Sequence, residues 1–158
     1  MFHRVLAISL LAAAAAFAQS TTATTRQFSF PLTSLGSTET MQINLLNTAS
    51  NSTSGTAASC TGSVSFLNSS GTVIGSATAF TLASGQLNSI SLPFAKAGIS
   101  GNRGIVRAVI SETRASGVPC SLVFSLETFD TSSGATHIFL PQADGGGGAG
   151  FPGGGPGR

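Results

Sequence analysis

The chain has 158 residues, with seven Lys and Arg against five Asp and Glu and a formal net charge of +2. It contains eleven phenylalanines but no tryptophan or tyrosine. Nucleic-acid binding depends on many phosphate contacts and commonly on stacking aromatic residues, so this composition argues against a nucleic-acid partner. We interpret Arg103, Arg107 and Arg114 as a row on a solvated sheet face rather than as a phosphate-binding cluster.

The first residues have the pattern of an export signal. A short basic start precedes an apolar run from Val5 to Phe17, and Ala16–Ala18 has the small-x-small form that precedes cleavage. A retained membrane anchor would need about 20 apolar residues, and this run is shorter. We therefore predict a signal peptide at residues 1–18 and a mature chain that starts at Gln19, without a membrane span, in the periplasm or outside the cell.

Residues 19–142 have the size of one domain with a single core. Apolar side chains recur there at every second position, which is the period of a strand with one buried face, and no segment shows the spacing of an amphipathic helix. The alternating runs are residues 26–32, 38–47, 59–68, 77–83, 89–94, 104–112, 117–130 and 135–141.

The segments between these runs favour chain reversal. Glycine, asparagine and serine gather at Asn68–Gly71, Ala83–Gln86, Ser100–Asn102 and Thr131–Gly134. These connections are too short to hold the helices that join parallel strands. We predict an all-β fold, an antiparallel two-sheet immunoglobulin-like sandwich of about eight strands, whose strand order the sequence leaves open.

The two cysteines are in phase with the apolar side of their runs. Cys60 has the phase of Val64, and Cys120 has the phase of Leu122. Since an exported chain meets an oxidising compartment, we predict a Cys60–Cys120 disulfide in the core. A reactive cysteine would need exposure and an electropositive setting, and neither sequence context offers them.

Few residues could carry acid–base or metal chemistry. His137 is the one histidine after the signal, and we interpret it as a surface residue because no second histidine could share a metal site. Glu127 and Asp130 are predicted on the outer side of a strand and at a turn, so we expect them to be solvated rather than paired in a cleft. Three further acidic residues stand alone in the sequence: Glu39, Glu112 and Asp144.

No motif for a serine nucleophile occurs. Gly145, Gly147 and Gly150 match the spacing of a phosphate-binding loop, but the glycine- and proline-rich continuation cannot open the helix that such a loop requires. Lys96, the one lysine, falls in a predicted loop, which disfavours an isopeptide cross-link. We predict no catalytic residue, no metal ligand and no cofactor.

Two loops and the C-terminal segment carry other signals. Asn51 and Asn68 begin glycosylation sequons in predicted loops. Residues 143–158 are so rich in glycine that we predict a disordered tail, because glycine cannot bury apolar area against its entropy cost. The sequence LPQAD at Leu140–Asp144 lacks the hydrophobic segment that would follow a wall-sorting motif.

Five segments occur in an order that resembles a set of uncharacterised exported bacterial proteins with a single sandwich domain. They are MQINLLNTA, SCTGSVSFLNSSGTVIG, FTLASGQLNSISL, RAVI and PCSLVFSLETFDTSSGATHIFL. The resemblance covers roughly Thr38 to Leu140. It implies the fold, and it implies no catalytic residue.

These observations predict a secreted or periplasmic, non-enzymatic binding or structural module that acts through loops or a sheet edge. The expected partner is a protein or a glycan of the cell exterior. The alternative is a self-assembling subunit of an extracellular polymer joined by strand addition, with QFSFPLT (residues 27–33) as the one candidate arm. A secreted hydrolase is the third hypothesis, which the scarcity of His, Asp and Glu disfavours.

Overall fold

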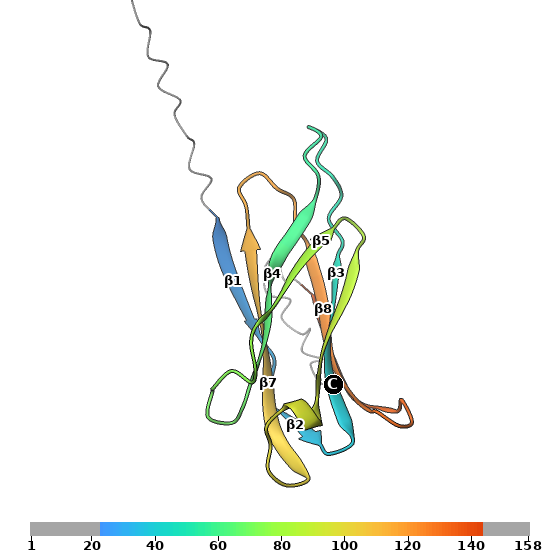
Figure 1. Ribbon diagram of the computed structural model, residues 1–158. Helices are drawn as coiled ribbons and strands as arrows, with labels where there is room; N and C mark the ends of the chain where they lie inside the picture. Colours follow the sequence, from blue (N-terminus) through green and yellow to red (C-terminus); the bar gives the residue numbers. More distant parts are fainter. Residues whose placement is uncertain (1–22, 144–158) are drawn as a thin grey trace, which may run out of the picture.

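The computed structural model describes residues 23–143, which form nine β-strands and one short 3₁₀ turn, Phe94–Lys96. The strands build two antiparallel sheets that face each other as a sandwich (Figure 1). Within this part of the chain, no helix has the length and apolar character that crossing a membrane would require.

The first sheet has five strands. In the order β1-β7-β4-β5 they are β1 (Thr24–Ser29), β7 (Arg103–Arg114), β4 (Ser59–Leu67) and β5 (Thr78–Ala83), and β2 (Thr33–Gly36) also pairs with β7. The second sheet has four strands in the order β6-β3-β8-β9. They are β6 (Leu87–Pro93), β3 (Glu39–Asn47), β8 (Leu122–Asp130) and β9 (Thr136–Ala143).

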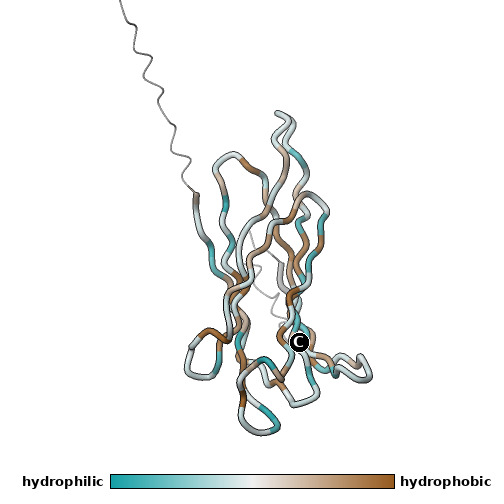
Figure 2. Tube along the Cα trace, viewed as in Figure 1, coloured by the Kyte–Doolittle hydropathy of each residue, from teal (hydrophilic) through white to brown (hydrophobic). Residues whose placement is uncertain are grey.

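Alternation along the strands places one face of each sheet in a shared core. On β3, Met41, Ile43 and Leu45 are fully buried, and the residues between them point to the other face. Aromatic rings from the two sheets meet in this core, where the ring centroid of Phe28 on β1 lies 5.0 Å from that of Phe124 on β8. Brown, apolar segments recur along the strands of both sheets (Figure 2).

The sequence predicts one strand over residues 26–32, where the structure has the end of β1 and the approach to β2. Both strands pair with β7, β1 with its second half and β2 with its first. Pro31 stands at the break, and a proline has no N–H to donate to a ladder. The ninth strand results from this interruption of a single predicted run.

Candidate functional site

The face of the second sheet that points away from the core carries three cross-strand rows of side chains. Because β3 pairs with both β6 and β8, and β8 pairs with β9, the register places these residues side by side. From β6 towards β9, the rows are Ser91, Gln42, Glu127 and Phe139; Ser89, Asn44, Ser125 and Pro141; and Leu87, Leu46 and Val123. We call these residues the outer face.

Two of the rows are joined by a network of side-chain hydrogen bonds. The amide nitrogens of Gln42 and Asn44 both donate to Oε1 of Glu127, each over 2.9 Å. Gln42 also donates to Oδ1 of Asn44. The hydroxyl of Ser91 donates to Oε1 of Gln42 over 2.9 Å, and that of Ser89 donates to Oδ1 of Asn44 over 2.6 Å. These contacts fix both amide groups in one orientation on the surface.

The third row makes one end of the outer face apolar. In this row Leu87 is 66% exposed and Val123 37%, and Phe139 of the first row is 58% exposed on β9. Together with Leu46 and Pro141 they line a shallow depression of about 370 Å³ beside Asn44. Large apolar side chains gathered on one exposed face are typical of interaction surfaces.

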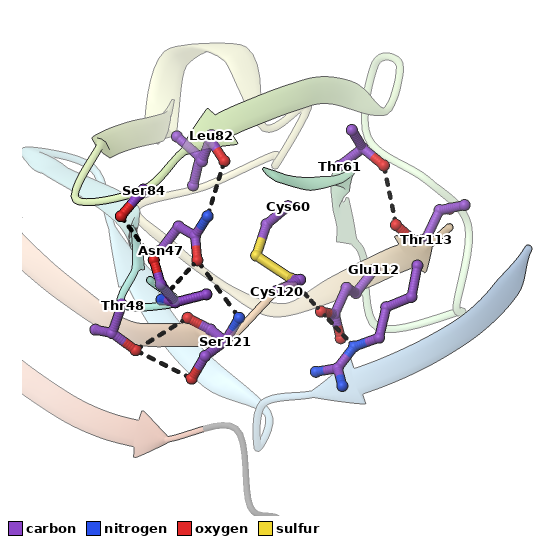
Figure 3. Close-up of a disulfide and its surroundings, with 12 residues drawn as sticks. Asn47, Thr48, Cys60, Thr61, Leu82, Ser84, Glu112, Thr113, Cys120 and Ser121 are labelled. Carbon is purple, nitrogen blue, oxygen red and sulfur yellow. Dashed lines mark hydrogen bonds and ion pairs between the residues drawn. A yellow bond between two sulfur atoms is a disulfide. The ribbon is translucent and has the colours of Figure 1, made fainter. Parts of the chain in front are cut away.

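The disulfide lies near Asn47, Thr48 and Ser121, where β3 ends and β8 begins (Figure 3). Cys60 on β4 and Cys120 form the predicted pair, with their Cα atoms 5.0 Å apart. Cys120 lies in the loop before β8, not within a strand as predicted, because β8 begins at Leu122. The N–H of Ser59 donates to the carbonyl of Pro119 over 2.9 Å, so this loop is tied to the start of β4.

Polar contacts beside the disulfide also join the two sheets. Asn47, at the end of β3, is fully buried, and its amide nitrogen donates to the carbonyl of Leu82 on β5 over 3.0 Å. The hydroxyl of Thr48 donates to Oγ and to the backbone oxygen of Ser121 (Figure 3). These bonds hold the strand ends that carry the apolar part of the outer face.

Glu112 is not an isolated acidic residue as its sequence context suggests, but lies fully buried beside the disulfide. Its Oε1 is 2.8 Å from Nε of Arg114 and 2.8 Å from Sγ of Cys120. A disulfide sulfur carries no proton, so the second approach is a contact rather than a hydrogen bond. Among residues 23–143, Oε2 of Glu112 has no hydrogen-bond partner.

Glu112 and the two cysteines form the one group of three potential metal ligands within the described residues. Metal binding by cysteine requires free thiolates, and both sulfurs are joined to each other here. The arrangement therefore fits a structural contact in the core.

The interpretation of three arginines as one solvated row is wrong for Arg114. Alternate residues of a strand point to opposite faces. Arg103 and Arg107 share the phase of the outward residues of β7, whereas Arg114 shares the phase of the buried Glu112 and pairs with it. The side chain of Arg114 is 28% exposed.

His137 is half exposed on β9, and it has a partner that no local sequence pattern indicates. Its Nδ1 lies 2.5 Å from Oε1 of Glu39, which is 98 residues away in the chain. The N–H of Gly36 donates to the other oxygen of Glu39 over 2.6 Å. Burial on its own would raise the pKa of Glu39, but these two contacts, together with the nearby charge of Arg103, outweigh it and hold the pKa below its ordinary value.

Asp130 closes the turn between β8 and β9. Its Oδ1 accepts hydrogen bonds from the hydroxyls and the backbone N–H groups of Ser132 and Ser133. These bonds, that of the Ser132 hydroxyl first, lower the pKa of Asp130 well below its ordinary value. Glu127 instead belongs to the outer face, so the two carboxylates have separate partners and separate roles.

The remaining candidates lie in loops. Lys96 is exposed in the 3₁₀ turn. The side chain of Asn51 accepts a hydrogen bond from the N–H of Ala58, and that of Asn68 accepts from Ser70 and Thr72. Both sequon asparagines thus hold their own loops in shape.

The predicted signal peptide (residues 1–18), Asp144 and the glycines of the apparent phosphate-loop match lie outside the described residues, as does the predicted tail except for its first residue, Ala143. No family model matches the chain, and neither a curated protein nor a solved structure matches it.

Proposed function

We propose that this protein is an exported, non-enzymatic binding module, secreted or periplasmic, that holds its partner on the outer face. We further place its sandwich among the immunoglobulin-like folds. The observation that carries the proposal is the outer face itself, where exposed apolar side chains adjoin an ordered set of amide, hydroxyl and carboxylate groups. A sheet face that contacts only water would need neither the exposed apolar side chains nor the ordered polar network.

Two further features support export and binding over catalysis. A buried disulfide between residues 60 positions apart fits an oxidising compartment and suits a protein outside the cytoplasm. The single histidine after the predicted signal is paired with Glu39 on the surface. General acid–base catalysis most often uses a histidine that faces the bound substrate, whereas His137 faces Glu39 and lies outside the three rows of the outer face.

The binding surface proposed here is a sheet face rather than the loops or sheet edge expected from the sequence. The alternative, a polymer subunit joined by strand addition, would use the arm at residues 27–33. In this structure β1 is paired with β7 along its length, and Phe30 is buried in the core. Strand addition would thus require the arm to leave its own sheet.

Sedimentation with intact cells of the producing strain tests the proposal. We expect the purified mature protein to sediment with the cells, and the Val123→Glu variant to stay in solution because a charge would enter the apolar depression. Ile105→Glu is the matched control, since Ile105 is 41% exposed on the first sheet. Equal sedimentation of all three proteins, or of none, would overturn the proposal.

Native mass under non-reducing conditions distinguishes the alternative. A binding module should be a monomer whose mass is two hydrogens below that of the reduced chain. A polymer that dissociates when the residues before Leu32 are removed would instead establish strand addition. Both measurements use the protein as recovered from the exterior of the producing cells.

A further inference from the structure

We infer that the outer face binds a neutral saccharide chain, an inference that rests on the proposed function and names its partner class. A sugar presents hydroxyl groups around its rim and an apolar C–H surface on the flat of its ring. The outer face offers a matching pair of features on adjacent strands. These are the amide and carboxylate network of β3 and β8 and the exposed ring of Phe139 on β9.

The polar part of the face suits hydroxyl groups, which both donate and accept hydrogen bonds. Beyond the bonds of the network, Asn44 has a second amide hydrogen to donate and Oε1 of Gln42 has a second lone pair, and the carboxylate of Glu127 supplies further acceptors. Both amide donors converge on Oε1 of Glu127, which directs a ligand hydroxyl to Oε2. Because the network already holds these side chains in place, a ligand would lose little binding energy to ordering them.

The apolar part lies within reach of the same sugar. Phe139 is directly opposite Glu127 in the β8–β9 register, and side chains in such positions have Cβ atoms about 5 Å apart. Phe139 is 58% exposed, so a flat apolar surface can pack against its ring. Pro141 is the next outward residue of β9 and extends this apolar border alongside Ser125.

The negative charge of the outer face favours a neutral saccharide over an anionic one. Glu127 is the one charged residue in the three rows of the outer face. A uronic acid or another anionic sugar would bring a second negative charge to Glu127, with no cation in those rows to offset it. A neutral chain meets no such repulsion.

Selective treatment of the cells identifies the partner class. Periodate cleaves vicinal diols of glycans, and protease removes exposed protein. If the inference holds, periodate treatment abolishes sedimentation of the protein with cells, and protease treatment leaves it unchanged. The opposite result would overturn the saccharide inference while leaving the binding function intact, because the partner would then be a protein on the same face.

Binding to purified polymers tests whether Phe139 and Glu127 take part in saccharide binding. Electrophoresis through gels that contain a neutral glucan, a neutral mannan or a polyuronate should show retardation by a neutral polymer only. We expect Phe139→Ala to weaken that binding about tenfold or more. Glu127→Gln, which keeps the shape of the side chain, should weaken it less. Thr81→Ala, on an exposed position of β5, is the matched control.

The results of the gel experiment either support or overturn the saccharide inference. Retention by a neutral polymer that Phe139→Ala reduces and Thr81→Ala does not would support the inference. Equal retention of both variants, or stronger retention by the polyuronate, would overturn it. Thermal melting of each variant shows whether a loss of binding is a loss of folding, and Glu127→Gln provides a second test if Phe139→Ala unfolds.

Discussion

Gly62 of β4 faces Phe80 of β5, and the ring of Phe80 occupies the space beside the missing side chain. A Cβ atom at position 62 would lie 2.8 Å from Cζ of Phe80 and 2.2 Å from the backbone oxygen of Ser111 on β7. Phe80 is 4% exposed, so the ring is part of the core. Because position 62 has no side chain, the backbone of β7 and the ring of Phe80 can both pack against β4 there.

Gly62→Ala should destabilise the protein by about 1–3 kcal/mol or more, because the added methyl group must displace backbone as well as the Phe80 ring. Urea denaturation measures the loss. Ser63→Ala, one residue along the same strand, is the control and should change the unfolding free energy by less than about 0.5 kcal/mol. Equal stability of the two variants would show that β4 can shift freely.

Cys60→Ser and Cys120→Ser should each lower the free energy of unfolding strongly and about equally. The disulfide spans 60 residues, and the loop-entropy model assigns such a link roughly 4 kcal/mol. Thermal melting under non-reducing conditions checks both variants, with the reduced wild-type protein as a reference that should match them. A negligible loss in either variant would argue against a stabilising core disulfide.

The ion pair between Glu112 and Arg114 should show energetic coupling. Glu112 is fully buried, and a hydrogen bond to a charged group contributes about 1.5–3 kcal/mol. A double-mutant cycle with Glu112→Gln and Arg114→Met measures this coupling from four unfolding free energies. Additivity within about 0.5 kcal/mol would mean that Arg114 does not stabilise the buried carboxylate.

Acid should destabilise the fold through Glu39 and Asp130. In the folded protein, the pKa of each carboxyl group lies below its ordinary value, which is 4.5 for Glu39 and 3.8 for Asp130. A carboxyl group with a lowered pKa stabilises the fold fully above its unfolded pKa, and this contribution is lost as the pH falls. Stability should therefore be level above about pH 5 and decline below about pH 4.5.

The variant Glu39→Gln/Asp130→Asn isolates this effect. Asn can still accept hydrogen bonds at the turn, and neither replacement titrates. Denaturation between pH 2 and 7 should give a shallower acid decline for the variant than for the wild-type protein. An equally steep decline would assign the acid sensitivity to other carboxyl groups.

Much of the fold could be predicted from local pattern. Alternation of apolar residues, as in Met41, Ile43 and Leu45, indicated strands and their buried faces, because a strand turns successive side chains to opposite sides. With two cysteines in a chain predicted to begin with an export signal, the pairing of Cys60 with Cys120 had no competitor. Pro31 could have indicated the division between β1 and β2, since proline cannot donate to a sheet ladder.

The outer face could not be predicted in this way. Gln42 and Asn44 looked like ordinary outward polar residues of one strand, and Glu127 like a solvated acid more than 80 positions later. Only the pairing of β3 with β8, and of β8 with β9, brings them together and sets Phe139 beside them. Glu39 with His137, and Glu112 with the disulfide, are likewise products of strand register.

The sequence by itself determined the strand class, the inward phase of the apolar residues and the disulfide pair, because these depend on local periodicity and on the number of cysteines. The tertiary structure alone decided which outward residues are neighbours. Strand order and register are set by the packing of distant segments against one core, and no short stretch of the chain contains that information. The surface that we propose for binding belongs to this second class.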